Sequence, residues 1–533
     1  MKLIRFKIEN HFVLKGLDIT FGEFQDKSPI TGKRQTYAID FLVGVNGTGK
    51  STVLRLLAAI FKAIESGTLD GDIQTGFELE YFLRDPKKKS DQRVVIRHRT
   101  GDLDTEGTIV ELDGGRASLD DVLPRHIVIL TSGDEESWRT TLKGPAASTD
   151  ADGAALRLPV TERYQRELPG YLPKPKIQEE QQQASESRLL FVQQQHLPLA
   201  TLCGLISHYA TVKAEFERLE QAGESKKVED ITGPLSLILE ESNIKSMVGF
   251  SLRCRLYKEL TQSTLHETVN HLQRLATRTI RQGPDRLLVF LGEPHQLAKR
   301  ITQNPELGRD LELYSALAPL VMPDEYGNQV LQDINIFLQL YPPVKSQKDR
   351  PSAPPLHLFK WLSDGERNFL SRMALMSLLT TADTLVLLDE PEVHFNDYWK
   401  RRIVKLLDSV MGEHYVHALI TTHSSITVTD ALSKDVVKLV RSGVYTTKSE
   451  PPAVETFGAD PSDVMIHLFD APFATGQYSV DEILSLLRGE GPITSQPRRE
   501  REIEKLEGTI DKIAPGYFRF RMREKIHRLR AGS

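Results

Sequence analysis

The residues of this 533-residue chain whose types and spacing best suit chemistry form a glycine-rich stretch near its start. Residues 44–51 read Gly-Val-Asn-Gly-Thr-Gly-Lys-Ser, with the spacing of a loop that cradles phosphates. Glycine lets such a backbone turn with positive φ and point its N–H groups inward at phosphate oxygens. An apolar strand precedes the loop, and an apolar-periodic helix begins near Lys50. The stretch therefore predicts a nucleoside triphosphate site.

Each residue type in this loop has an expected role. The ammonium of Lys50 would lie between the β- and γ-phosphates, and the hydroxyl of Ser51 would bind Mg²⁺. The dipole and the first amides of the following helix would face the same anion. We therefore expect ATP and Mg²⁺ as cofactors. The loop residues expected to bind ATP are Asn46, Gly47, Gly49, Lys50, Ser51 and Thr52.

Two carboxylates end a second apolar strand at residues 385–390, Leu-Val-Leu-Leu-Asp-Glu. Asp389 would hold Mg²⁺ directly or through water, and Glu390 would orient or deprotonate the attacking water. The alternative is a strand that simply ends in an acidic turn. A further apolar strand at 418–422 delivers His423 at its end, where ligands bind in open α/β sheets. A lone histidine is nevertheless more often structural than catalytic.

The stretch Leu362-Ser-Asp-Gly-Glu-Arg367 has the pattern of a helix start, because Ser363 and Glu366 have capping-box spacing. Taken alone, this stretch could simply be the start of a helix.

The elements around these motifs predict an α/β domain with a mixed sheet flanked by helices. Alternating runs near 76–83, 94–98 and 108–112 predict a small antiparallel sheet, and 330–340 has strand character. Residues 265–281 are typical of the mostly helical pattern between the two halves of the domain. The expected divisions are an N-terminal ATPase half (1–137), a loop or partly ordered insertion (138–187), a mainly helical insertion (188–325), a C-terminal ATPase half (326–445) and a helical region with a basic tail (446–533).

Bulk properties exclude some classes of protein. The net charge of −5 gives no global attraction to nucleic acid, so any such surface must be a local patch. Two cysteines make neither a disulfide framework nor a zinc site, which suits a cytoplasmic location. No run of 18 apolar residues exists, so we expect no membrane span.

The four motifs, in this order and spacing, resemble the ABC-type ATPase domain. Residues 362–367 are a variant of that family's signature, with Asp364 and Glu366 in place of the commoner glycine and glutamine. The resemblance implies two chains meeting head to tail, each ATP lying between the phosphate loop of one chain and Ser363 and Gly365 of the other. It also implies that His423 contacts the γ-phosphate, and Tyr37 is a candidate for the aromatic that stacks on adenine.

The phrase Asp-Glu-Pro-Glu-Val-His at 389–394 resembles the branch of OLD-type and recombination-type SMC ATPases. Only about 110 residues follow His423, and they contain no strand-borne Asp-x-Asp pair, so we expect no TOPRIM nuclease in the chain. The whole chain most resembles the PtuA family, the ATPases of Septu antiphage systems and of their retron-associated forms. That resemblance implies an HNH nuclease partner similar to PtuB, a reverse transcriptase–nucleic acid complex in retron forms, and assemblies of dimers.

The function expected is that of a slow ATPase that controls an associated nuclease in antiphage defence. A DNA-repair ATPase that binds DNA directly is one alternative, and a non-catalytic scaffold that holds ATP is another. The tail at 516–530 carries six basic residues, a single acid and the aromatics Tyr517, Phe518 and Phe520. It could bind nucleic acid or an acidic partner, or be an amphipathic helix that packs its aromatics on the body.

Overall fold

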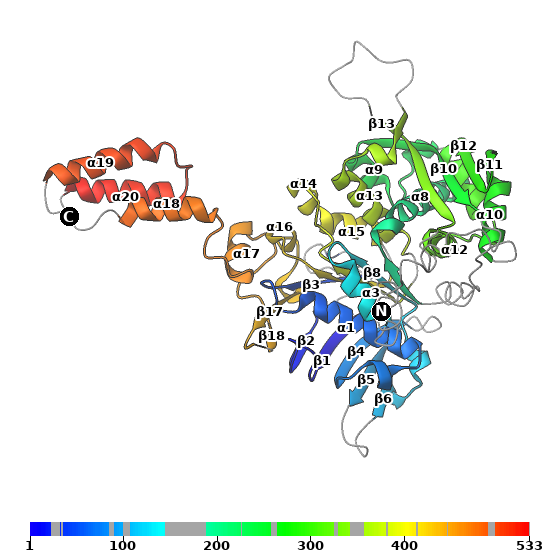
Figure 1. Ribbon diagram of the computed structural model, residues 1–533, viewed down its shortest axis with the longest axis horizontal. Helices are drawn as coiled ribbons and strands as arrows, with labels where there is room; N and C mark the ends of the chain where they lie inside the picture. Colours follow the sequence, from blue (N-terminus) through cyan, green and yellow to red (C-terminus); the bar gives the residue numbers. More distant parts are fainter. Residues whose placement is uncertain are drawn as a thin grey trace, which may run out of the picture. The chain divides into compact units, whose positions relative to one another are not determined.

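The computed structural model describes residues 1–22, 32, 36–84, 90–99, 107–143, 188–224, 226–256, 264–323, 329–341, 356–379, 382–411, 414–444, 446–488 and 496–531. The chain forms two compact units, Met1–Ala459 and Asp460–Ser533, whose elements are labelled in Figure 1. Among the described residues, no helix has both the length and the apolar character that crossing a membrane requires.

A seven-stranded sheet forms the centre of the first unit. In spatial order its strands are β18 (Thr447–Glu450), β17 (Val436–Arg441), β3 (Ala38–Val43), β16 (Val416–Thr421), β15 (Thr384–Asp389), β8 (His126–Thr131) and β9 (Leu189–Val192). All neighbours are parallel except the antiparallel pair β17–β18. Every residue of β15 and β16 is buried, as expected for parallel strands covered on both faces. The predicted α/β class with a mixed sheet is therefore confirmed.

A six-stranded antiparallel sheet lies on the other side of helix α1 (Lys50–Glu65). Its strands, in order, are β2 (Leu17–Thr20), β1 (Lys2–Ile8), β4 (Phe77–Arg84), β5 (Asp91–Arg99), β6 (Gly107–Leu112) and β7 (Gly115–Arg116). The buried face of α1 is unusually wide and belongs to one apolar core with residues of both sheets, including Leu79 and Leu387. A helix buried between two sheets needs apolar residues over most of its circumference. The short helices α2 (Leu69–Asp72) and η1 (Leu119–Val122) and helix α3 (Glu135–Lys143) complete this half.

The prediction of a mainly helical insertion at 188–325 leaves out a sheet to which this region contributes three of five strands. Helices do make up the larger part of its described residues: η2 (Gln194–His196), α8 (Leu197–Gln221), η3 (Val228–Asp230), α9 (Ser236–Glu241), α10 (Thr264–Leu275), α11 (Pro294–Thr302) and α12 (Leu311–Val321). A five-stranded antiparallel sheet accompanies them, in the order β11 (Arg278–Gln282), β12 (Asp285–Leu291), β10 (Ile244–Arg255), β13 (Leu331–Leu340) and β14 (Leu356–Leu358).

Two details of this region correct the sequence prediction. The helix expected over 265–281 ends at Leu275, and β-branched Thr279 and Ile280 lie in strand β11 instead. Strand β13, expected at 330–340, is present but pairs with β10 of the insertion rather than with the phosphate-loop half. The two-residue alternation of buried Phe250, Leu252 and Cys254 was the signal for β10.

The helices that follow the five-stranded sheet carry the remaining motifs. They are η5 (Phe359–Trp361), α13 (Asp364–Ser377), α14 (Asp397–Lys400), α15 (Ile403–Met411), α16 (Ser425–Val428) and η6 (Ser433–Asp435), and α13 packs against α8 and α15. Of the predicted loop at 138–187, residues 144–187 lie outside the described residues. Its first residues belong to α3, where Trp138 is buried, so the loop was placed too early.

The second unit comprises α17 (Pro461–Leu468), α18 (Gln477–Arg488), α19 (Gln496–Ile510) and α20 (Tyr517–Ala531). Its small core is formed by Ile483, Leu506, Met522 and Ile526. We placed the start of this region at 446, but β18 pairs with β17 of the first unit, so the boundary falls after Ala459.

The basic tail of this unit is less basic at its surface than its sequence indicates. Five of its six basic residues pair with acids of the same unit: Arg519 with Asp511, Arg521 and Arg528 with Glu524, Lys525 with Glu502, and Arg530 with Glu507. Tyr517 and Phe520 are each 65% exposed, so the expectation that the aromatics pack on the body is wrong for these two. Phe518 does pack against the small core.

Candidate active site

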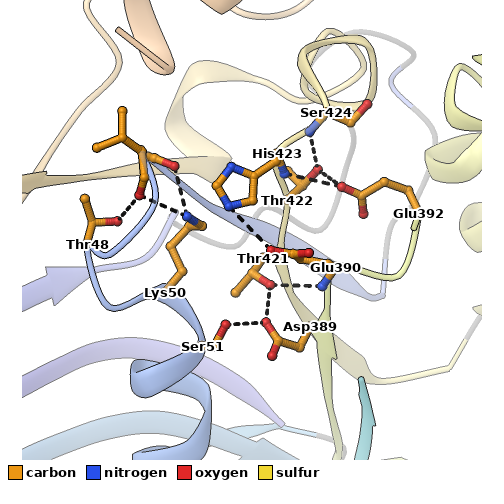
Figure 2. A network of polar contacts seen from close by, with 12 residues as sticks. Thr48, Lys50, Ser51, Asp389, Glu390, Glu392, Thr421, Thr422, His423 and Ser424 are labelled. Atoms are coloured by element: carbon orange, nitrogen blue, oxygen red, sulfur yellow. Dashed lines mark hydrogen bonds and ion pairs between the residues drawn. The ribbon is translucent and has the colours of Figure 1, made fainter. Parts of the chain in front are cut away.

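The parallel register of three neighbouring strands brings the predicted motifs to one edge of the sheet (Figure 2). Asp389 of β15 pairs with Thr421 of β16, and Thr421 pairs with Leu42 of β3. The phosphate loop, the two carboxylates and His423 all follow these strand ends. Parallel strands end at a common edge, and so residues far apart in the chain meet there.

The phosphate loop has the backbone that its glycines predict. Gly44, Gly47 and Gly49 have φ values of 144°, 79° and 91°. A Cβ on Gly44 would lie 2.4 Å from the carbonyl oxygen of Leu439, and one on Gly49 would lie 2.5 Å from the side chain of Leu14. Both positions therefore require glycine for space as well as for φ.

The ammonium of Lys50 is folded back into the loop. Its Nζ donates to the carbonyl oxygen of Gly44 at 2.9 Å and to that of Val45 at 3.2 Å. Burial lowers the pKa of Lys50 to about 8, although the charges of Glu390 and Asp389 act in the opposite direction. A cation held by two neutral carbonyls would gain much from a phosphate placed beside it. Of the other loop residues, Asn46 and Gly47 are exposed, and Ser51 and Thr52 are half-buried.

Asp389 is the centre of the polar network in Figure 2. One carboxylate oxygen accepts from the hydroxyls of Ser51 at 2.8 Å and Thr421 at 2.6 Å. The other accepts from the indole N–H of Trp138 at 3.2 Å. Sequence reasoning missed Thr421 and Trp138, because neither belongs to a motif. Their contacts hold the carboxylate of Asp389 in one orientation.

The oxygens of Ser51 and Asp389 suit a magnesium ion. Both are hard oxygen donors, and they lie 2.8 Å apart. Adjacent ligands of an octahedral Mg²⁺ with bonds of about 2.1 Å are roughly 3 Å apart. The pair could therefore occupy neighbouring coordination positions with little movement.

Glu390 and His423, the two residues predicted to be catalytic, lie next to each other. A Glu390 carboxylate oxygen lies 3.4 Å from Nε2 of His423. Glu390 has φ of 52°, an uncommon left-handed conformation. Its backbone N–H donates to the hydroxyl oxygen of Thr421 at 3.0 Å. Burial and the nearby Asp389 raise the pKa of Glu390, whereas burial and Lys50 lower the pKa of His423. A carboxylate with a raised pKa is a stronger base, which suits activation of water.

Ser363 and Gly365 lie at the start of α13, where the capping box is confirmed. The Ser363 hydroxyl accepts from the N–H of Glu366 at 3.3 Å, and the Glu366 carboxylate accepts from the N–H of Ser363 at 2.8 Å. Within the described part of the chain, no hydrogen bond or ion pair joins either residue to Lys50 or Ser51. The two residues therefore take no part in the polar contacts that join Ser51, Asp389 and the strand ends.

The candidate aromatic for adenine is wrong. Tyr37 precedes β3, at the opposite end of that strand from the phosphate loop, and its hydroxyl donates to Asp408. Phe12 is 78% exposed on the loop between β1 and β2, next to Val13 and Leu14, whose side chains face Gly49. Phe12 precedes β2 and β3 in the chain, so a search for an aromatic just upstream of the phosphate loop does not reach it.

Comparisons with known proteins agree with this geometry. A family described as "AAA domain, putative AbiEii toxin, Type IV TA system" matches residues 289–429. The ribose import ATP-binding protein RbsA of Bacillus licheniformis is 30% identical over 101 residues, which are 19% of this chain. The chain spans 19% of the length of RbsA.

Two solved structures are similar at low scores. One is the SMC head domain from Thermotoga maritima, with 11% identity, 85% of this chain and 100% of that chain covered, and a TM-score of 0.30. The other is the Smc head domain with an extended coiled coil bound to the C-terminal domain of ScpA, from Pyrococcus furiosus, with 13% identity, 92% and 100% coverage, and a TM-score of 0.30.

The phosphate loop, the adjacent carboxylates and the histidine share one sheet edge, and the sequence matches an AAA domain and an ATP-binding protein. Parts of the chain are thus similar to AAA and ABC ATPases, and its site has the arrangement of a P-loop nucleotide site.

Proposed function

We propose that this protein binds ATP with Mg²⁺ and hydrolyses it slowly, between two chains, to control a partner nuclease. The observation that carries the nucleotide part is the meeting of Ser51 and Asp389 at 2.8 Å, although 338 residues separate them. The ammonium of Lys50 and the Glu390–His423 pair lie beside this contact. Such an arrangement suits a triphosphate and its metal ion.

Each residue has a role in this proposal. The loop amides and Lys50 hold the phosphates, and Ser51 and Asp389 hold Mg²⁺, which would neutralise charge on the phosphate oxygens. Glu390 positions a water and accepts its proton, and His423 contacts the γ-phosphate. Phe12 is the exposed aromatic best placed to meet the base.

Head-to-tail association is supported by the lack, among the described residues, of polar contacts that join Ser363 or Gly365 to Lys50 and Ser51. The start of α13 offers a helix N-terminus, and Ser363 offers a hydroxyl, both suited to phosphate. Placed against the phosphate loop of a second chain, they would complete the site. Hydrolysis would then require the dimer.

The defence role rests on the resemblance to the PtuA family and on the matching AAA domain, whose description refers to a toxin of a toxin–antitoxin system. An HNH nuclease partner, and in retron forms a reverse transcriptase–nucleic acid complex, follow from the same resemblance. In this role the ATPase gates the nuclease, which explains why slow turnover suffices.

The test combines a phosphate-release assay with nuclease co-purification. We expect slow turnover that Lys50→Ala abolishes, and ATP-dependent retention of a co-expressed HNH nuclease. Turnover stimulated by DNA with a steep salt dependence, and no retention of the nuclease, would favour a DNA-repair ATPase instead. Nuclease retention with no turnover would favour a scaffold.

A further inference from the structure

A buried arginine and a buried glutamate link the start of α13 to the catalytic pair. Arg372 lies on the third turn of α13 and is 1% exposed, and Glu392 follows the catalytic carboxylates and is 4% exposed. Neither belongs to the motifs that assign the ATP site. Charged side chains are seldom buried this deeply unless they are paired with other groups.

Arg372 holds the turn that follows Glu390. Its Nη1 donates to the carbonyl oxygen of Pro391, and to that of Val393 at 3.2 Å. The guanidinium also lies over the ring of Phe395, 5.2 Å from its centroid. The turn needs such support because the residues at its two ends, Glu390 and His394, both have left-handed backbones, with φ of 52° and 73°.

Glu392 holds the other side of the same turn. Its carboxylate accepts from the hydroxyl of Thr422, and from the N–H of His423 at 3.3 Å. Thr422 in turn accepts from the N–H of Ser424 at 2.9 Å. The contacts in Figure 2 thus tie Glu392 to the backbone that carries His423.

The N-terminal part of α13 packs on the same segment. A Cβ on Gly365 would lie 3.0 Å from the carbonyl oxygen of His394, so the helix and the turn are in close contact there. Phe369 stacks on Trp399 with ring centroids 4.5 Å apart, and meets Phe395 edge to face at 5.5 Å. A shift of the start of α13 would therefore be transmitted to the turn.

We infer that Arg372 and Glu392 are positioning residues that couple the start of α13, where a second chain's ATP would bind, to Glu390 and His423 of the same chain. This inference rests on the proposed function. Arg372 fixes the turn to α13, and Glu392 fixes the turn to the His423 backbone. Together they keep Glu390 and His423 at 3.4 Å.

Both side chains keep unused hydrogen-bonding capacity. Among the described residues, Nε and Nη2 of Arg372 and Oε2 of Glu392 are buried without a hydrogen-bond partner. Buried polar atoms without partners cost free energy, so this arrangement is not explained by stability alone.

The test separates turnover from binding in the full-length protein. Glu392→Met fills the space but accepts no hydrogen bond, and Arg372→Met removes the donors. We expect each to lower kcat at least about tenfold while ATP affinity stays within about threefold. Glu392→Gln keeps the acceptor and should stay within about threefold of wild-type kcat. The double variant should be no worse than the poorer single variant, because the two act on one turn.

Arg402→Met is the matched control. Arg402 is a nearby arginine that pairs with Glu241 and stacks on Tyr398, outside the linked turn. Its removal should leave kcat unchanged. If the Met variants do not fold, Thr422→Val removes one donor to Glu392 without changing a charge, and should lower kcat several-fold with unchanged ATP affinity.

Wild-type kcat in Glu392→Met or Thr422→Val, or a loss of kcat matched by an equal loss of ATP affinity, would overturn the inference alone. A wild-type protein without turnover would overturn both the inference and the proposed function.

Discussion

The ammonium of Lys50 is held by two neutral carbonyl oxygens where a phosphate would supply full charge. Burial lowers its pKa to about 8, so the free protein carries this charge at pH 7 and loses it as the pH rises through about 8. ATP binds the charged form better, and therefore binding must be linked to the proton on Lys50.

The ATP affinity of the wild-type protein should fall as the pH rises from 7 to 9, by up to about tenfold per pH unit above 8. Titration of a fluorescent ATP analogue at several pH values measures this. Lys50→Ala should bind roughly ten- to a hundredfold more weakly at pH 7, the loss expected for a charged hydrogen bond, and should show no such slope. A flat profile for the wild-type protein would contradict the role given to Lys50. Lys62→Ala, at the far end of α1, is the control.

Glu390→Gln should lower kcat by about a hundredfold or more and leave ATP affinity nearly unchanged, because it removes the base but keeps the size of the side chain. Wild-type turnover should also decline as the pH falls, because the raised pKa of Glu390 lets this carboxylate become protonated at a pH above its usual pKa of 4.5. Phosphate release measured from pH 5 to 8 checks both. The control is Asp397→Asn, which changes an exposed acid on α14 and should have the kcat of the wild type. A wild-type kcat in Glu390→Gln would show that Glu390 is not the base.

At the scale of elements, α13 has two separable duties. Ser363 caps the helix, which stabilises the fold, and it is an exposed residue that would contact a second chain's nucleotide in the proposed dimer. Since aspartate caps helices as well as serine does, the two duties can be tested apart.

Ser363→Ala should lower the free energy of unfolding by about 1 kcal/mol through loss of the cap. Ser363→Asp should keep that stability but place a carboxylate against the partner's phosphate, and so prevent ATP-dependent dimers. Chemical denaturation and light scattering with ATP measure the two effects. ATP-dependent dimers of Ser363→Asp would show that the start of α13 is not part of the site.

At the scale of the whole molecule, each proposed site takes Lys50 from one chain and Ser363 from another. Two differently inactivated chains can therefore restore one site between them.

An equimolar mixture of Lys50→Ala and Ser363→Asp should recover turnover, at most about half of the wild-type value, although each alone is inactive. Each mixed dimer has one intact site of its two. A mixture as inactive as its components would contradict the head-to-tail arrangement, and activity of either variant alone would contradict a shared site.

The sequence by itself determined the phosphate loop, the carboxylate pair, the histidine and the capped helix start. Each is a short contiguous pattern whose spacing has a local physical reason, such as the positive φ of Gly47 or the capping box of Ser363 and Glu366.

Only the tertiary structure decided which other residues serve the site. Trp138, Thr421, Arg372 and Glu392 act through contacts with residues remote in the chain, and no local pattern encodes these contacts. The strand pairing of the five-stranded sheet was also not predictable, since β13 was expected from its local pattern but its partner β10 lies far away in the chain. Parallel register places Asp389 beside Ser51, and that long-range pairing turns separate motifs into one site.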